Sequence, residues 1–134
     1  QVWDSFRVAK RAKVIHLIEK SNSLEAIHNG YQNRGFLHKR IFNWNENEVT
    51  IKDKINKSTN NEAKAFFHLH SSLNRPRINE NEVRIDSLGS LMIFNETTNI
   101  EIEEYQLSEG FNKTILAYKI IVSFNQNLET IISI

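Results

Sequence analysis

The chain has 134 residues, of which 40% are hydrophobic and 25% are charged. This length suits one domain with its own core, and this composition excludes long disordered or collagen-like segments. Because there is no cysteine, disulfides and thiolate metal sites are excluded. The 17 basic and 16 acidic residues give a formal net charge of +1, so the overall charge favours neither nucleic acid nor a membrane surface.

The start of the chain is unusual for a complete protein. It opens at Gln1, without an initiating methionine and without the basic and apolar regions of a signal peptide. We therefore expect residues 1–134 to form a single domain of a larger protein. Apolar runs such as Ile120–Val122 are far shorter than the ~20 residues of a membrane helix, so we expect no membrane span.

Apolar residues recur mainly with period two, in short runs separated by Asn, Ser, Glu and Gly. This pattern predicts many strands and little helix, because β-branched and aromatic residues dominate the runs. Regular strand spacing favours an all-β fold, an antiparallel two-sheet sandwich of about ten strands. In chain order, the predicted strands lie near Val2–Val8, Arg11–Glu19, Leu24–Gln32, Phe36–Trp44, Val49–Ile55, Ala63–Ser71, Glu82–Asp86, Ser90–Asn95, Asn99–Leu107, Thr114–Phe124 and Leu128–Ile134.

The connections between these strands are rich in asparagine. Asn tolerates the left-handed backbone region and caps its own backbone, so Asn45–Asn47, Ser58–Asn61 and Asn79–Asn81 are predicted loops. The single proline, Pro76, falls in a further predicted loop, Leu73–Ile78. No repeat or shift of composition marks a second domain.

One hairpin can be predicted in register. Phe36–Trp44 and Val49–Ile55 flank a short polar turn, which places Arg40 opposite Asp53 on an otherwise apolar face. A buried charge is costly unless it is paired, so these side chains either form a structural ion pair, which we favour, or line a polar concavity. The other pairs predicted on this face are Trp44 with Val49, Phe42 with Ile51 and His38 with Ile55.

The histidines are grouped most closely in Phe66–His70. In a strand, His68 and His70 lie on one face, and this spacing can chelate a metal. A metal site needs a third ligand, however, and no acidic cluster or metal motif is near in sequence. We favour the simpler interpretation, a half-exposed strand with two histidines on its polar face, and we predict no metal ligands in this chain.

Basic residues gather in three places, which suits a polyanion. Because guanidinium groups bind carboxylates and sulfates through paired hydrogen bonds, an acidic polysaccharide fits as well as phosphate. The alternative is a solvated strand face. The clusters are Arg7–Lys13, Arg34 with His38–Arg40, and Arg75–Arg77.

Other functional signatures are weak. The sequence contains no nucleic-acid-binding motif, no nucleophile elbow and no glycine-rich phosphate loop. Several aromatic residues suit stacking on sugar rings, although their positions in strands favour core packing for most of them. These aromatic residues are Trp3, Phe6, Tyr31, Tyr105 and Tyr118.

Several short motifs follow one another in a characteristic order. They are Val2–Ala12, His28–Tyr31, His38–Arg40, Asp53, Phe66–Leu69 and Leu128–Ile132. In this order and spacing they resemble the vWgsFRvg.RA, h.gY, HrR, D, fHl and terminal stretches of heparinase II/III-like proteins. The resemblance covers nearly the whole chain, although each motif is short.

The resemblance implies a polysaccharide lyase with an N-terminal helical toroid and a C-terminal, supersandwich-like β-sandwich, with the substrate cleft between them. Such enzymes cleave uronic-acid-containing polysaccharides by β-elimination. In the family, the catalytic tyrosine and an Asn or His belong to the toroid. The metal-binding and catalytic histidines of the sandwich precede the FRv stretch. No residue here is therefore carried over as catalytic or as a metal ligand, and any metal site of the parent protein is expected upstream, leaving this chain without a cofactor.

On this resemblance, residues 1–134 are the C-terminal domain of an exported bacterial lyase, periplasmic or secreted, and are inactive alone. The expected partners are an acidic polysaccharide, bound through the parent protein, and the protein's own N-terminal helical domain, but neither nucleic acid nor a membrane. The alternative is a non-catalytic carbohydrate-binding or structural sandwich in a polysaccharide-related protein. The candidate substrate contacts are Arg7, Arg11, His38 and Arg40.

Overall fold

The computed structural model describes residues 2–4, 7–56 and 62–133, with side chains from residue 11 onward. Phe6 and the predicted loop Ser58–Asn61 lie outside the described residues, as do the side chains of Trp3 and Arg7. The described chain is almost entirely β-strand. Its elements are β1 (Val2–Asp4), β2 (Arg7–Lys10), β3 (Val14–Lys20), β4 (Ser23–His28), the 3-10 helix η1 (Gln32–Arg34), β5 (His38–Trp44), β6 (Glu48–Ile55), β7 (Ala63–His68), β8 (Arg77–Asn79), β9 (Glu82–Ile85), β10 (Ser90–Gly110) and β11 (Lys113–Ser133).

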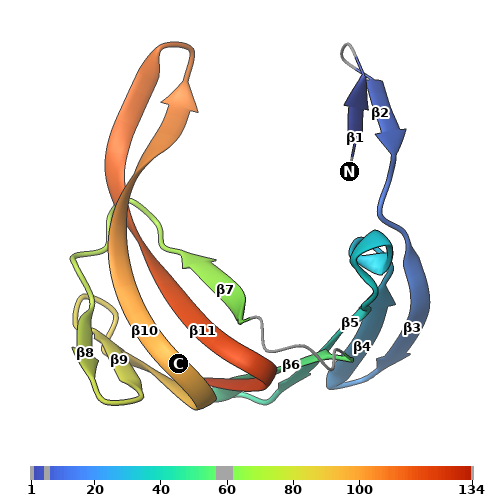
Figure 1. Cartoon of the computed structure of the whole chain (residues 1–134). Helices are drawn as coiled ribbons and strands as arrows, with labels where there is room; N and C mark the ends of the chain where they lie inside the picture. Colours follow the sequence, from blue (N-terminus) through green and yellow to red (C-terminus); the bar gives the residue numbers. More distant parts are fainter. Residues whose placement is uncertain (1, 5–6, 57–61, 134) are drawn as a thin grey trace.

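Hydrogen bonding divides these strands into two antiparallel sheets (Figure 1). The β1–β2 hairpin forms the small sheet, and nine strands form the large one in the order β3-β4-β5-β6-β11-β10-β9-β8, with β7 also paired to β11. The prediction of an all-β antiparallel fold with little helix is therefore confirmed. No helix in the described part of the chain is long and apolar enough to cross a membrane.

The core lies where the long strands β10 and β11 curve. Strands β6 and β7 pair with successive segments of β11, residues 127–133 and 119–124, while β10 also pairs with β11 along its length. The Phe67 ring on β7 is 5.5 Å from the Phe94 ring on β10, centroid to centroid. The fully buried side chains near this contact include Val83, Ile120 and Leu128. Burying such side chains stabilises the fold by roughly 1.5–3 kcal/mol each.

The predicted division of the C-terminal half into four strands was wrong. Ser90–Asn95 and Asn99–Leu107 belong to one strand, β10, just as Thr114–Phe124 and the last segment belong to β11. The polar residues between these predicted strands do not end them. They form bulges instead, with register shifts around Thr97, and a bulge interrupts the side-chain alternation without ending the strand.

Other strand boundaries also need correction. β3 begins at Val14 rather than Arg11, and β4 ends at His28, after which the chain forms η1 rather than continuing to Gln32. Val2–Val8, predicted as one strand, is divided between β1 and β2. The predicted loop Leu73–Ile78 runs into β8, an edge strand of three residues that is too short to produce alternation.

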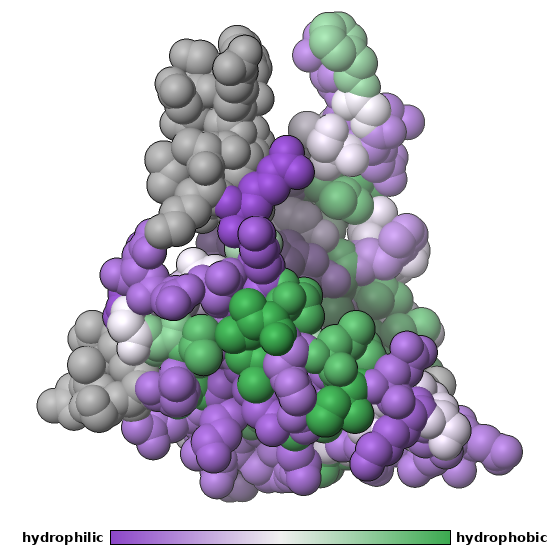
Figure 2. All heavy atoms as spheres, turned by 90° about the vertical axis from the view of Figure 1, so that its right-hand side faces the viewer, coloured by the Kyte–Doolittle hydropathy of each residue, from purple (hydrophilic) through white to green (hydrophobic). Residues whose placement is uncertain are grey.

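The outer strand of the large sheet carries apolar side chains outside the core (Figure 2). β3 pairs with β4 along one edge and stands at the end of the strand order. Figure 2 shows a group of apolar side chains near the middle of this face. The large apolar residues of β3 that are exposed are Val14, Ile15, Leu17 and Ile18.

Candidate functional site

Three neighbouring strands, β4, β5 and β6, position the candidate site. The β5–β6 ladder pairs Arg40 with Asp53 and His38 with Ile55, which confirms the register predicted from the short polar turn. The β4–β5 ladder then places His28 directly opposite His38. Antiparallel pairing therefore brings residues from three strands to one place on the sheet.

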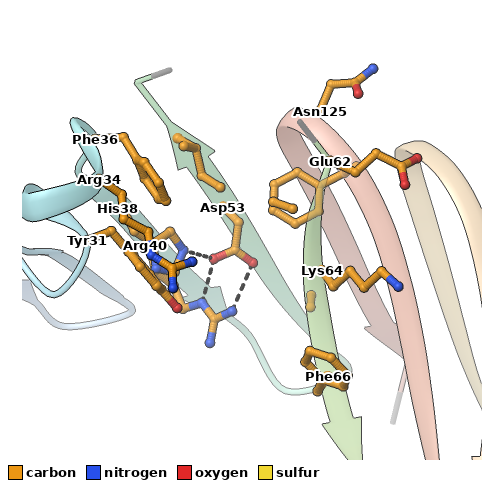
Figure 3. A pocket seen from close by; sticks show the side chains of 14 residues that line it. Tyr31, Arg34, Phe36, His38, Arg40, Asp53, Glu62, Lys64, Phe66 and Asn125 are labelled. Atoms are coloured by element: carbon orange, nitrogen blue, oxygen red, sulfur yellow. Dashed lines mark hydrogen bonds and ion pairs between the residues drawn. The ribbon is translucent and has the colours of Figure 1, made fainter. Parts of the chain in front are cut away.

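Asp53 is at the centre of this group, and only 1% of its side chain is exposed. Arg40 donates from Nε to Oδ1 at 2.6 Å and from Nη2 to Oδ2 at 3.1 Å. The second partner, His38, makes a 2.6 Å hydrogen bond from Nε2 to Oδ1. Burial alone would raise the pKa of Asp53, but the hydrogen bonds from His38 and Arg40 outweigh it and hold the pKa below its usual range. The carboxylate is therefore ionised and well paired (Figure 3).

A second hydrogen bond extends this group to β4. His28 Nε2 lies 2.9 Å from His38 Nδ1, and the Gly30 backbone N–H donates to His28 Nδ1 at 3.1 Å. Burial, followed by the nearby His38 and Arg40, lowers the pKa of His28. The His28 imidazole is therefore neutral near pH 7.

His38, Arg40 and Asp53 border a groove of about 630 Å³ (Figure 3). On one side, the Tyr31 ring stacks on Phe36 at 5.0 Å, and Tyr31 is 43% exposed. On the other side, β7 contributes Lys64 and Phe66, and the Phe66 side chain is 51% exposed. The groove thus presents aromatic faces from two different parts of the chain.

The groove is also cationic. Arg34, Arg40 and Lys64 line it, and neither Arg34 nor Lys64 forms an ion pair in the described part of the chain. The lining carboxylates are occupied: Asp53 is bound by Arg40, and Glu62 accepts a hydrogen bond from the Thr98 hydroxyl. Two unpaired cations beside exposed rings can bind an anionic ring-shaped ligand.

The predicted contact residues are only partly brought together. His38 and Arg40 line the groove, whereas Arg11 is exposed and does not belong to it, and the side chain of Arg7 lies outside the described residues. Sequence reasoning did not include His28 or Phe66 in the site. The sequence predicts a strand at His28 just before the strand of His38. It does not predict that the two histidines pair, because that depends on the path of the residues that connect the strands.

Among the residues with described side chains, the second and third basic clusters lie apart. Arg34 and His38–Arg40 meet at the groove, but Arg77 binds Asp86 at 2.7 Å and the Arg75 guanidinium lies 5.8 Å from the Tyr118 ring centroid. The Tyr105 hydroxyl donates to the Leu69 carbonyl at 3.0 Å. These residues take part in the framework away from the groove.

The two histidines of the Phe66–His70 stretch have separate partners. The His68 ring meets the Tyr105 ring edge to face at 5.0 Å, while His70 Nδ1 is 2.8 Å from the Ser72 hydroxyl. Among the described residues, no group of three or more His, Asp or Glu side chains could hold a metal ion. The absence of a cofactor from this chain stays a prediction.

Comparison with known proteins identifies the family. Residues 1–134 match the family model described as Heparinase II/III-like, C-terminal. The chain belongs to this family. The resemblance carried by the short motifs is therefore confirmed for the whole domain, although no curated protein matches it in sequence.

Solved structures share the fold of this heparinase II/III-like C-terminal domain. Heparan sulfate lyase HepC from Pedobacter heparinus is 15% identical, with a TM-score of 0.67 over 92% of this chain and 21% of the lyase chain. A heparinase III, the BT4657 gene product, is 10% identical, with a TM-score of 0.62 over 91% and 21% of the two chains. The domain thus spans about a fifth of the length of these solved chains. At these identities the likeness shows the fold alone.

Proposed function

We propose that this domain is the C-terminal β-sandwich of a bacterial polysaccharide lyase, and that its groove holds an acidic sugar residue of the substrate. The observation that carries the proposal is the combination of Arg34 and Arg40 with the exposed rings of Tyr31 and Phe66 in one groove. The family and its solved lyase neighbours support the enzyme class.

The groove suits a uronic acid for two reasons. Arg40 binds Asp53 through Nε and Nη2, which leaves its Nη1 group directed away from the carboxylate. A guanidinium edge of this kind pairs with a carboxylate or sulfate oxygen. The apolar face of a pyranose ring packs on an aromatic ring such as Tyr31, so one sugar can use both kinds of contact.

The proposed reaction is β-elimination at a uronic acid. A base removes the C5 proton, the C5–H electrons form the C4–C5 double bond, and the bond from C4 to the glycosidic oxygen breaks. That oxygen then receives a proton. Cations near the uronate carboxylate favour this reaction because negative charge develops there as the C5 proton leaves.

In this proposal the domain supplies one wall of the substrate cleft. The base and the acid belong to an N-terminal helical domain and to residues upstream of this chain, and the parent protein is exported to the periplasm or beyond the cell. The domain by itself then has no activity and needs no cofactor of its own. Its partners are the helical domain and an acidic polysaccharide.

The direct test joins the domain to the upstream region of its parent protein. We expect the joined protein to produce the ultraviolet absorbance of unsaturated uronates from at least one acidic glycan, and the domain alone to produce none. Lack of absorbance from the joined protein on alginate, heparan sulfate and related polymers would contradict the lyase proposal.

A second candidate is a carbohydrate-binding domain without catalysis. It is favoured by the exposure of Tyr31 and Phe66 in the groove of the domain itself. Under the lyase proposal the isolated domain binds glycans weakly, because part of the cleft is supplied by other segments. Tight and specific binding by the isolated domain on a glycan array, with no product from the joined protein, would favour this second candidate.

A further inference from the structure

His28 and His38 belong to a chain of hydrogen bonds in which each donor and acceptor can be assigned. The Gly30 N–H can only donate, so His28 Nδ1 accepts and the hydrogen of a neutral His28 ring is on Nε2. This hydrogen then points at His38 Nδ1, so the hydrogen of a neutral His38 is also on Nε2, where it is donated to Asp53. The backbone of one strand connection thereby fixes the tautomers of two rings.

We propose that His28 and His38 are positioning residues that hold Asp53 and Arg40 in place for anion binding, and that acid removes this support. The proposal rests on the proposed function of the groove and adds its regulation. His38 and the Arg40 Nε–H share the same carboxylate oxygen, Oδ1 of Asp53. The position of the Arg40 guanidinium is therefore fixed through Asp53 by the histidine next to it.

A proton added to His28 or His38 breaks one of the hydrogen bonds that link Gly30, His28 and His38. If His28 is protonated, its Nδ1–H faces the Gly30 N–H across a 3.1 Å contact. If His38 is protonated, either its Nδ1–H faces the His28 Nε2–H at 2.9 Å, or His28 changes tautomer and its Nδ1–H again faces Gly30. Each case places two donors against each other, and a lost hydrogen bond in a partly buried site is costly.

The surrounding charges also act on the rings. From β5 the positive Arg40 opposes a charge on His28, while on β6 the Asp53 carboxylate that His38 contacts is already bound by Arg40. On the β3 side, His28 faces Val14, an apolar residue. The remaining titratable groups that line the groove with His38 are Tyr31 and Arg34 on the η1 side and Glu62 and Lys64 on the β7 side.

Of these two hydrogen-bonded histidines, His28 also contacts Tyr31, one of the aromatic residues that line the groove. The His28 ring lies 5.5 Å from the Tyr31 ring, centroid to centroid, and 5.0 Å from the His38 ring. Displacement of His28 from the Gly30 N–H therefore disturbs Tyr31 as well as Asp53. Acidification should weaken both the cationic and the aromatic contacts of the groove.

The test uses the 134-residue chain and nitrogen-15 NMR of its imidazole and guanidinium groups. Above pH 7 we expect His28 and His38 to show the Nε2–H tautomer, and the Arg40 Nε–H to exchange slowly with water. Towards pH 5 we expect that protection to be lost and the affinity for glucuronate, the probe, to fall about tenfold, the size expected for one lost hydrogen bond to a charged group.

Variants separate positioning from general stability. His28→Gln keeps an amide N–H near His38 Nδ1 but does not titrate, so its glucuronate affinity should depend less on pH. His28→Leu removes the donor and should bind weakly at every pH. His16→Gln is the matched control, because His16 pairs with Glu25 on the same sheet and does not line the groove.

Two results would overturn the proposal. One is an Nδ1–H tautomer in either ring at neutral pH, and the other is the same pH profile of Arg40 protection in the wild type and His28→Gln. Failure of the proposed function is distinguishable, because glucuronate would then fail to bind at any pH while the tautomers and the Arg40 protection still behaved as expected.

Discussion

Two arginine–aspartate pairs in this domain have similar geometry and different surroundings. Arg40 and Asp53 meet at 2.6 Å on β5 and β6, and Arg77 and Asp86 meet at 2.7 Å near β8 and β9. The Asp53 side chain is 1% exposed, whereas that of Asp86 is 55% exposed. The first pair also receives a hydrogen bond from His38.

The difference decides what each pair does. The hydrogen bond from Arg77 is the largest cause of the lowered pKa of Asp86, whose side chain is mostly exposed to water. At Asp53, burial raises the pKa of the carboxyl, and the hydrogen bonds from His38 and Arg40 outweigh this effect and keep the carboxylate charged. A salt bridge of similar length therefore contributes little to stability at the surface, whereas loss of one partner beside the groove leaves a buried charge unpaired.

The largest expected effect comes from Asp53→Asn. The amide keeps one oxygen for His38 and Arg40 Nε, but it removes the negative charge and places an NH2 donor where Oδ2 accepts from Arg40 Nη2. We therefore expect the free energy of unfolding to fall by about 3 kcal/mol, as for other broken buried pairs. Urea denaturation of the 134-residue chain measures this loss. Asp86→Asn is the matched control and should leave the denaturation midpoint nearly unchanged. Equal losses in both variants would remove the distinction between the two pairs.

A smaller effect is expected from acid. The pKa of His28 is lower in the folded chain than in the unfolded chain, so the unfolded chain takes up this proton first. The contribution of His28 to stability is therefore complete above about pH 6.5, the usual imidazole pKa, and is lost as the pH falls below it. Thermal unfolding between pH 7.5 and 5 should follow this slope, and His28→Gln should flatten it. If His28→Gln showed the same pH dependence of stability as the wild type, groups other than His28 would be responsible for that dependence.

The two regions also differ in how well the sequence predicts them. The Arg40–Asp53 pairing follows from the sequence because a short polar turn and strict alternation permit one register. The contact of His28 with His38 does not, because β4 and β5 are joined by nine residues of irregular chain, 29–37, whose path depends on η1 and the Gly35 turn. Gly35 has φ of 81°, which few other residues adopt.

The long strands show a second limit of sequence reasoning. The sequence predicts two strands, ending at Asn95 and beginning at Asn99, where β10 is continuous with bulges around Thr97, because polar residues interrupt the alternation there. Only pairing with β11 distinguishes a bulge from a turn, and that pairing joins residues far apart in sequence, such as Asn95 with Glu129. The groove is subject to the same limit, since β7 reaches it through its pairing with β11.

The smallest expected effect on stability, and the most specific on binding, comes from Arg34→Gln. Arg34 lines the groove without an ion pair in the described part of the chain, so removing its charge breaks no internal contact of that kind. We expect an unchanged unfolding midpoint and a severalfold weaker retention on a column of an acidic polysaccharide, since one charge-assisted contact is lost. Arg77→Gln is the matched control: it removes the same charge from the chain, but from a pair outside the groove. If both variants were retained equally weakly, the polysaccharide would be responding to net charge, and the groove would lose its claim to be the binding site.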